Sequence, residues 1–190
     1  SSVSDSFPYT VSDGNVSATA TISVTIPPTP TCNQDLTNTY NNGGVALTAA
    51  DISNPSTQFY WPENGHIYQL VENSIPWTDA AAFAAAQSIR GVPGHLVTIT
   101  SFDEQNFIDS FLSDGAYWIA ASDATLEGCW KWVAGPEAGT LVDSGFRKWE
   151  PSNPDGGGDY AELLIGERGS DWNDTGNLDN DYFIIEFSGV

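Results

Sequence analysis

Residues 149–174 read WEPSNPDGGGDYAELLIGERGSDWND, and this stretch decides how the rest of the chain is interpreted. Its first part combines proline, asparagine and aspartate with three successive glycines, residues that are typical of turns. Residues 160–165 then have the apolar content of a strand, and Trp172 precedes the polar pair Asn173-Asp174. Two polar segments therefore flank one predicted strand.

Carboxylates are concentrated in and after this stretch. The 190-residue chain has 25 Asp and Glu against 5 Lys and Arg, a formal net charge of −20. Within residues 153–181 the basic residue is Arg168, and the acids are Asp155, Asp159, Glu162, Glu167, Asp171, Asp174, Asp179 and Asp181. Calcium takes about 6–8 oxygen ligands and would neutralise such a cluster, so these segments are candidates for a cation site. The same acidity excludes nucleic acid as an expected partner, because phosphate binding needs clustered Lys and Arg.

The composition of the chain changes at Pro27. Before it, residues 7–26 alternate apolar and polar side chains on both sides of a turn, which predicts a short all-β segment of two strands. The proline-rich residues 27–30 make a stiff linker, and the polar residues after them indicate loops and at most one short strand. The expected parts are the strand pair at 1–26, a linker or uncertain region at 27–58, and a folded domain at 59–190.

The folded domain has the pattern of an α+β protein. Helices are expected at 77–90, where alanines raise helix propensity, and from Ser101, whose spacing to Glu104 is that of a capping box. Strands are expected at 65–71, 96–99, 117–120, 129–133, 160–165 and 182–187. Residues 135–159 and 166–181 lack an apolar period, so we expect two long loops there, and loops of this length are usually functional or disordered.

The order of these motifs resembles the C-type lectin-like domain over about residues 59–188. The motifs that carry the resemblance are Gly65-His66-Ile67-Tyr68, Trp77-Thr78-Asp79-Ala80, Gly94-His95-Leu96-Val97-Thr98-Ile99, Tyr117-Trp118-Ile119-Ala120-Ala121-Ser122-Asp123, Trp130-Lys131-Trp132, Trp149, Asn153-Pro154-Asp155, Trp172-Asn173-Asp174 and Phe183-Ile184-Ile185-Glu186-Phe187. The resemblance implies two helices, antiparallel sheets and long calcium-binding loops. The disulfides usual in animal members have no counterpart, and Tyr160 stands where one of those cysteines would be.

The resemblance also implies that the two loops jointly hold one Ca²⁺. The ligands that it implies are Asn153, Asp155, Asn173 and Asp174, with a cis proline between the first two. A further acidic ligand of the family falls on Gly158, so either one ligand is missing or Asp159 reaches in. An accessory calcium position maps onto Asp123 and Glu127, with Asp159 as a shared ligand. The alternatives are a solvated turn for the first group and a capped or salt-bridged loop for the second.

Carbohydrate binding follows from the same resemblance. Two vicinal sugar hydroxyls complete the coordination shell of the ion, each donating to a carboxylate and accepting from an amide that also holds the metal. The carbohydrate-binding residues would then be the same Asn153, Asp155, Asn173 and Asp174. The amide–Pro–acid order of Asn153-Pro154-Asp155 resembles galactose-type selectivity. Fucose stays open because its ring also offers suitable vicinal hydroxyls, and mannose is disfavoured.

Residues 7–26 resemble the last two strands of immunoglobulin-like or cadherin-like repeats in large bacterial surface adhesins, here taken to be of RTX type. The implied function is a calcium-dependent lectin module of such an adhesin, secreted or at the bacterial cell surface. Its partners would be cell-surface glycans and the neighbouring domains of the same adhesin. The alternative is a lectin-like fold used for protein or ice contact or as a structural spacer, with calcium only rigidifying the loops.

The two cysteines lead to expectations about disulfide bonding and about catalysis. Cys32 and Cys129 form either one disulfide or two unrelated thiols, and an extracytoplasmic setting is expected. An enzyme is not expected, because the enzymes known on this fold need a reactive cysteine pair whose context these two residues do not match. Membrane insertion is not expected either, since no apolar run reaches the roughly 18–20 residues that a span requires.

Overall fold

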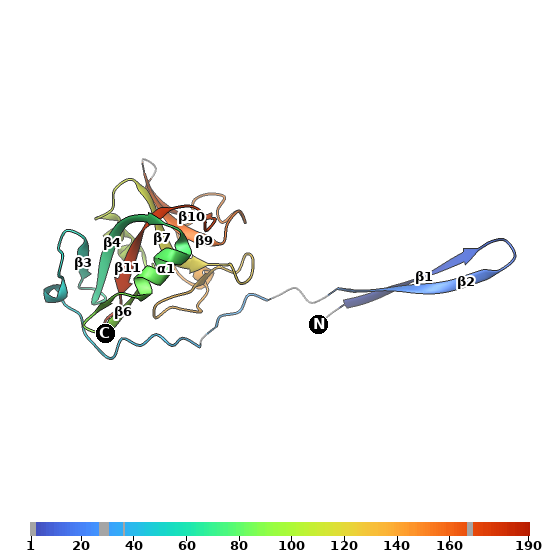
Figure 1. Ribbon diagram of the computed structural model, residues 1–190, viewed down its shortest axis with the longest axis horizontal. Coiled ribbons are helices and arrows are strands. Elements are labelled where there is room, and N and C mark those ends of the chain that lie inside the picture. The colour runs from blue at the N-terminus through green and yellow to red at the C-terminus, as the bar shows by residue number, and fades with distance from the viewer. Residues whose placement is uncertain (1–2, 27–30, 36, 167–168) are drawn as a thin grey trace. The chain divides into compact units, whose positions relative to one another are not determined.

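The computed structural model describes residues 3–26, 31–35, 37–166 and 169–190. The expected linker at 27–30 and the acidic-loop residues 167 and 168 lie outside the described residues. The chain divides into two units, Ser1–Cys32 and Asn33–Val190, and each is described by itself (Figure 1). Both cysteines are disulfide-bonded, so neither is a free thiol. Among the described residues, no helix combines the length and the apolar character needed to cross a membrane.

The first unit is an antiparallel hairpin of β1 (Val3–Ser12) and β2 (Ser17–Ile26). Its turn is fixed by Asp13, whose Oδ1 accepts the backbone N–H groups of Asn15 and Val16 at 2.9 and 2.8 Å. Such side-chain bonds to the following backbone are the reason that aspartate favours turns. The strand pair expected here is confirmed, whereas its origin in an immunoglobulin-like or cadherin-like repeat stays a prediction.

The strand register gives this hairpin two different faces. One face pairs apolar side chains across the strands, as Phe7↔Ile22, Tyr9↔Ala20 and Val11↔Ala18. On the other face serines, threonines and a proline alternate with them. Phe7 is 56% exposed and Tyr9 is 49% exposed within the described residues. Because an isolated two-stranded hairpin is at best marginally stable in water, this apolar face needs a cover.

The second unit is built on one large sheet. Its elements in chain order are η1 (Ala49–Asp51), β3 (Gln58–Trp61), β4 (His66–Ile75), α1 (Trp77–Ala85), β5 (Ser88–Ile89), β6 (Val92–Leu96), α2 (Phe102–Asp109), β7 (Gly115–Ser122), β8 (Lys131–Trp132), η2 (Val142–Ser144), β9 (Tyr160–Gly166), β10 (Gly169–Thr175) and β11 (Asp181–Phe187). The strand order is β10-β9-β7-β11-β4-β3, with β8 paired to β7 and β6 paired to β11. Neighbours are antiparallel except β7 and β11. The expected α+β class with two α-helices is confirmed.

Large aromatic side chains fill the core of this unit. Trp118 of β7, Trp172 of β10 and Phe183 of β11 are each 0% exposed. Helix α1 packs against β6, β7 and β11 (Figure 1), and its first residue, Trp77, donates its indole N–H to the carbonyl of Ile119 at 2.9 Å. Burying each such side chain contributes roughly 1.5–3 kcal/mol. The core therefore holds α1 against the sheet that carries the acidic loops.

Helix α1 is shorter than the predicted 77–90. It begins with Pro76 at the N-cap, where no side-chain cap is present, and ends at Ala85. Arg90 and Gly91 then take positive φ values of 51° and 86°, so the chain reverses and β5 pairs with β6. Gly91 thus belongs to a tight turn between strands, which glycine permits at no steric cost.

The segment 166–181, expected to be a loop, contains strand β10. The strand pairs with β9 along its whole length, with Trp172 opposite Leu163. Its buried positions alternate with less buried ones and are Ser170, Trp172 and Asp174. The prediction was wrong because polar residues occupy two of the three buried positions, which hides the strand period.

The second unit also begins earlier than residue 59, at Asn33. The backbone N–H of Asp35 donates to the carbonyl of Gly139 at 2.8 Å, and that of Val190 donates to Val45 at 3.1 Å. Leu47 is 2% exposed and joins the core. Most of the segment expected to be a linker therefore belongs to the folded unit.

Candidate calcium and carbohydrate site

Trp172 anchors the strand that carries half of the expected ligands. Its indole N–H donates to Oε1 of Gln105 in α2 at 2.8 Å. Its backbone N–H donates to Lys148 at 2.7 Å, and its carbonyl accepts from Glu150 at 2.8 Å. The buried ring thus fixes both β10 and the start of the 150–158 loop, and it sets the next two residues against that loop.

Asp174 binds the backbone of the loop directly. Its Oδ1 accepts the N–H of Asp155 at 3.1 Å, and its Oδ2 accepts those of Gly156 and Gly157 at 3.1 and 3.2 Å. The peptide bond between Asn153 and Pro154 is cis, as expected. Asp174 is 6% exposed, whereas Asp155 lies at the surface. One carboxylate of the expected site is therefore held rigidly, and the other is open to solvent.

The two asparagines of the expected site lie side by side. Nδ2 of Asn153 donates to Oδ1 of Asn173 at 2.5 Å. Nδ2 of Asn153 also lies 3.4 Å from Oε2 of Glu150, and Nδ2 of Asn173 donates to Oε1 of Glu162 at 2.7 Å. The structure thus brings together the four residues that the sequence predicts for the principal ion, on one surface formed by the loop and β10.

Glu150 and Glu162 belong to this cluster, although the sequence alone does not predict them as ligands. Glu162 is 7% exposed and is the direct cross-strand partner of Asn173. Burial raises the pKa of Glu162 to about 7, and the neighbouring carboxyl of Asp181 acts in the same direction. The signal for Glu162 is the register of β9 and β10, which can be read only once β10 is known to be a strand.

Gly158 has no room for the acidic side chain that the family places at this position. An ideal Cβ on Gly158 would lie 2.1 Å from the carbonyl carbon of Thr175. Asp159, the expected substitute, is exposed, and its carbonyl accepts the backbone N–H of Asp123 at 3.2 Å. This contact associates Asp159 with the accessory position.

The accessory position is centred on Asp123, which is 1% exposed. Its Oδ2 accepts the backbone N–H of Gly128 at 2.7 Å, whereas its buried Oδ1 has no hydrogen-bond partner among the described residues. Burial raises the pKa of Asp123, and the charges of Glu127 and Asp159 raise it further. Glu127 is exposed, and its Oε1 would lie 3.2 Å from a Cβ on Gly156. The accessory loop therefore borders the principal one.

A separate acidic group lies inside the fold, between β4, α2 and β11. Among the described residues, His66, Glu104 and Glu186 have ligand atoms that all lie within 4.8 Å of one another. Nδ1 of His66 is 2.6 Å from Oε1 of Glu186. Glu104 accepts the hydroxyl of Tyr68 at 2.6 Å, and it accepts the N–H of Thr100 at 2.7 Å instead of closing the expected capping box. Internal hydrogen bonds account for this group.

Burial and the charges of neighbouring side chains shift the pKa values of this group. Burial and the charge of Glu186 raise the pKa of Glu104 to about 7. For His66, burial opposes the charged form, but the hydrogen bond and the charge of Glu186 outweigh it, so that the pKa of His66 is raised. Burial also acts to raise the pKa of Glu186, but the charges of His95 and His66 overcome it and the pKa is lowered. The group thus makes stability depend on pH.

The sheet with its two helices and paired surface loops is the fold of a binding module of the lectin type. A family model described as the Lectin C-type domain matches residues 74–187. The chain belongs to the C-type lectin domain family.

Individual relatives and structures resemble the chain over most of its length. Halomucin of Haloquadratum walsbyi is 32% identical over 170 residues, which cover 80% of this chain and 2% of halomucin. The carbohydrate-recognition domain of the mouse scavenger receptor C-type lectin is 26% identical, with a TM-score of 0.59 over 72% of this chain and 98% of that one. A calcium-independent type II antifreeze protein has the same fold at 22% identity, with a TM-score of 0.58 over 72% of this chain and 95% of that one. The chain spans less than half of the length of the first curated relatives that it matches.

Proposed function

We propose that this chain is a calcium-dependent carbohydrate-binding module. The observation that supports it most is the convergence of Asn153, Asp155, Asn173 and Asp174 on one surface, joined by the hydrogen bonds from Asn153 to Asn173 and from Asp155 to Asp174. Side-chain oxygens from two chain segments are what a hard cation needs. The proposal includes no catalytic step.

The donor set of the principal position fits calcium. Asp155 and Asp174 provide carboxylate oxygens, and the two asparagines provide amide oxygens, since a half turn of the amide exchanges oxygen and nitrogen. Glu150 and Glu162 lie within hydrogen-bond distance of these asparagines. Their carboxylates would replace the acidic ligand that is missing at Gly158. Calcium prefers such oxygen ligands, and extracellular modules bind it with Kd of about 10⁻⁴–10⁻³ M.

The accessory position supports a second ion. Leaving a buried oxygen without a partner costs about 1–3 kcal/mol, and Oδ1 of Asp123 is in that position among the described residues. A cation shared by Asp123, Glu127 and Asp159 would remove that cost and offset the repulsion of their carboxylates.

Sugar selectivity follows from the side chains that would contact both ion and ligand. A bound calcium ion would supply two coordination positions for vicinal hydroxyls. Asp155 and Asp174 would accept hydrogen bonds from those hydroxyls, and Asn153 and Asn173 would donate to them. With the amide before Pro154 and the acid after it, we propose galactose-type ligands, with fucose-containing glycans as the next candidates.

The wider setting that we propose is a surface adhesin, secreted or attached to a bacterial cell. The β1–β2 hairpin would be the end of a preceding immunoglobulin-like or cadherin-like repeat, which would cover the exposed face that carries Phe7, Tyr9 and Val11. Several copies of a lectin domain on one cell bind with a higher avidity than one copy, because each further binding event occurs at a high effective concentration. Weak single sites therefore suffice for adhesion.

A glycan array read with calcium and with excess chelator tests the proposal. We expect galactose- or fucose-terminated glycans to retain the protein in 5 mM calcium, a concentration of roughly 5–50 times the Kd range above, and chelator to release it. Calcium that raises the melting temperature without any glycan binding would favour the alternative, in which the ion only rigidifies loops for protein or ice contact.

A further inference from the structure

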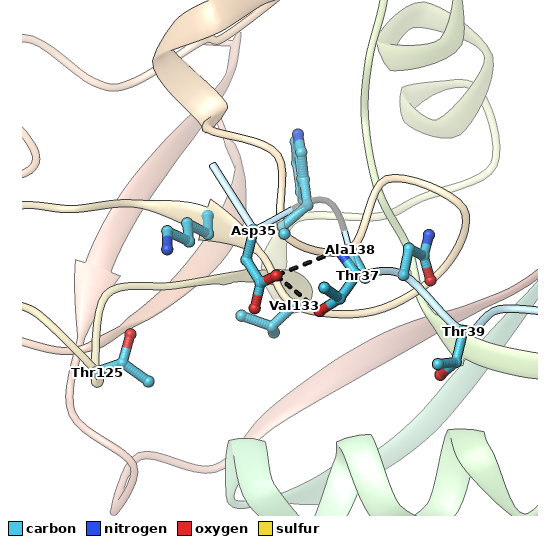
Figure 2. Close-up of a pocket in the computed structure, with 10 residues that line it drawn as sticks. Asp35, Thr37, Thr39, Thr125, Val133 and Ala138 are labelled. Atoms are coloured by element: carbon cyan, nitrogen blue, oxygen red, sulfur yellow. Dashed lines mark hydrogen bonds between the residues drawn. The ribbon is translucent and has the colours of Figure 1, made fainter. Parts of the chain in front are cut away.

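A groove runs beside the accessory loop, between the N-terminal segment of the second unit and the chain after β8. Two cavities of 310 and 380 Å³ share Asn38, Thr39, Val133 and Ala138 in their walls, so they adjoin along one groove. Figure 2 shows the first cavity, with Thr125 on one side of the view and Thr39 on the other. We call the groove formed by the two cavities the Asp35 groove, because Asp35 and Thr37 lie between Thr125 and Thr39 in this view.

Hydrogen bonds between the two segments build the walls of this groove. The N–H of Asp35 donates to the carbonyl of Gly139 at 2.8 Å, and a Cβ on Gly139 would lie 1.5 Å from the carbonyl oxygen of Asp35. Nδ2 of Asn38 donates to the carbonyl of Gly135 at 3.1 Å. Both segments are therefore fixed relative to each other, and the groove exists before any ligand binds.

The groove contains a lysine that forms no ion pair in the described part of the chain. The described ion pairs of the other cations are Arg90–Asp51, Arg147–Asp143 and Lys148–Asp171. Lys131 lines the groove together with Asp35. Hydrogen bonds from Thr37 lower the pKa of Asp35, and the charge of Lys131 acts in the same direction. Among the described residues the Lys131 ammonium therefore has no ion-pair partner, whereas Oδ1 of Asp35 already accepts the backbone N–H and the hydroxyl of Thr37 at 3.2 and 2.7 Å, so Lys131 is the charged group of the groove that is open to a ligand.

The lining favours an uncharged, hydroxyl-rich ligand. The hydroxyls of Thr39 and Thr125 make no hydrogen bond to other described residues, and both line the first cavity. Sugar hydroxyls donate and accept, so they match an ammonium, a carboxylate and threonines at once. An anionic ligand would be repelled by the net charge of −20. The cavity volumes also fall at the lower end of the roughly 300–1,000 Å³ that small-molecule sites occupy.

The groove adjoins the calcium loops. Thr125 lies between Asp123 and Glu127 in the accessory loop, and Glu127 borders Gly156 of the principal loop. We propose that the Asp35 groove binds the inner residues of an oligosaccharide whose terminal sugar occupies the calcium site, with Lys131 and Thr125 as specificity-determining residues. This inference rests on the proposed function, because the calcium site supplies the anchor for the terminal sugar.

The test is a glycan array on which each terminal sugar is presented alone and at the end of tri- to pentasaccharides. It compares the wild type with Lys131→Gln, Thr125→Ala and the charge-matched control Arg90→Gln, each in calcium and in chelator. We expect the wild type and the control to bind the longer glycans about tenfold more tightly than the monosaccharide. We expect both groove variants to lose most of this gain while they keep monosaccharide binding and the wild-type melting temperature.

The outcomes separate the two proposals. Calcium-dependent binding with no gain from length, or a gain that Lys131→Gln leaves unchanged, overturns the groove proposal and leaves the calcium site standing. Length-dependent binding that persists in chelator and needs Lys131 overturns the calcium proposal, and with it the part of the groove proposal that places the terminal sugar on calcium. Binding of no glycan overturns both, and saturable binding of an unstructured peptide probe in the groove assigns it to a different ligand.

Discussion

The side-chain amide of Asn153 donates a hydrogen bond to Oδ1 of Asn173 at 2.5 Å, across a sequence separation of 20 residues. The first residue lies in a loop and the second in β10, and the bond holds their polar groups at one place on the surface. Asp174 completes the connection by accepting three backbone N–H groups of the same loop. The loop is thus shaped by the side chains that we propose as ligands.

Replacing Asp174 by asparagine removes one negative charge from the principal position at nearly constant volume. We expect Asp174→Asn to weaken calcium-dependent retention on galactose-coated resin at least tenfold, because a carboxylate ligand is lost. The control is Asp171→Asn, in which a half-buried carboxylate 3.5 Å from Lys148 is changed. Equal retention by the two variants would argue against Asp174 as a ligand.

Replacing Asp123 by asparagine should change the free energy of unfolding in opposite directions in chelator and in calcium. In chelator, Asp123→Asn removes a carboxylate whose charged form is disfavoured by burial and by the charges of Glu127 and Asp159, and we expect it to raise the free energy of unfolding by about 1 kcal/mol. In 5 mM calcium, a concentration above the rough Kd range of such modules, the wild type should gain more than the variant by mass action. Urea unfolding under both conditions measures this. A variant that is less stable in chelator would contradict the assignment.

Stability should fall as pH rises through the range where Glu104 titrates. The folded protein keeps a proton on Glu104 up to about pH 7, whereas the ordinary pKa is 4.5. More protons are bound in the folded state between these values, so the free energy of unfolding decreases with rising pH there, by about 3 kcal/mol. The contribution of Glu186, whose pKa is lowered, is present above its ordinary value and is lost only at lower pH.

Glu104→Gln tests this dependence with exposed Glu63→Gln as the control. Urea unfolding in chelator at pH 5 and pH 8 should show a smaller loss of stability in Glu104→Gln than in the control, because the titrating group is gone. The idea fails if both variants lose the same stability between the two pH values.

Exchanging the side chains around Pro154 should change sugar preference. The double variant Asn153→Glu with Asp155→Asn places the acid before the proline and the amide after it. We expect its ratio of galactose to mannose affinity, measured by competition on the resin, to fall at least tenfold. An unchanged ratio in a variant that still binds calcium would show that residue order does not set the preference here.

The sequence predicts the fold of the second unit largely because its apolar segments are regular. The strands that contain Trp118 and Phe183 have continuous apolar runs, and the structure confirms them. The helix starting at Ser101 is predicted from its cap, and the Ser101 hydroxyl indeed accepts the N–H of Glu104 at 3.1 Å. Such patterns can be predicted because their physical causes, an apolar run and a capping side chain, lie within the segment itself.

Features that depend on contacts between distant residues could not be predicted. Strand β10 is polar at the surface and pairs with β9, so only the tertiary partner reveals it. The absence of a side chain at position 158 has its cause in the backbone of Thr175, which no local pattern indicates. The participation of Glu162 in the site follows from its position opposite Asn173.

Calorimetric titration of calcium tests the central claim most directly. The wild type is compared with Asp155→Asn/Asp174→Asn and with the charge-matched control Asp143→Asn/Asp171→Asn, whose residues pair with Arg147 and Lys148. We predict saturable binding with a Kd of about 10⁻⁴–10⁻³ M for the wild type and the control, and loss of the corresponding site in the first double variant. The same binding isotherm in all three proteins, or no calcium binding by the wild type, would contradict the account.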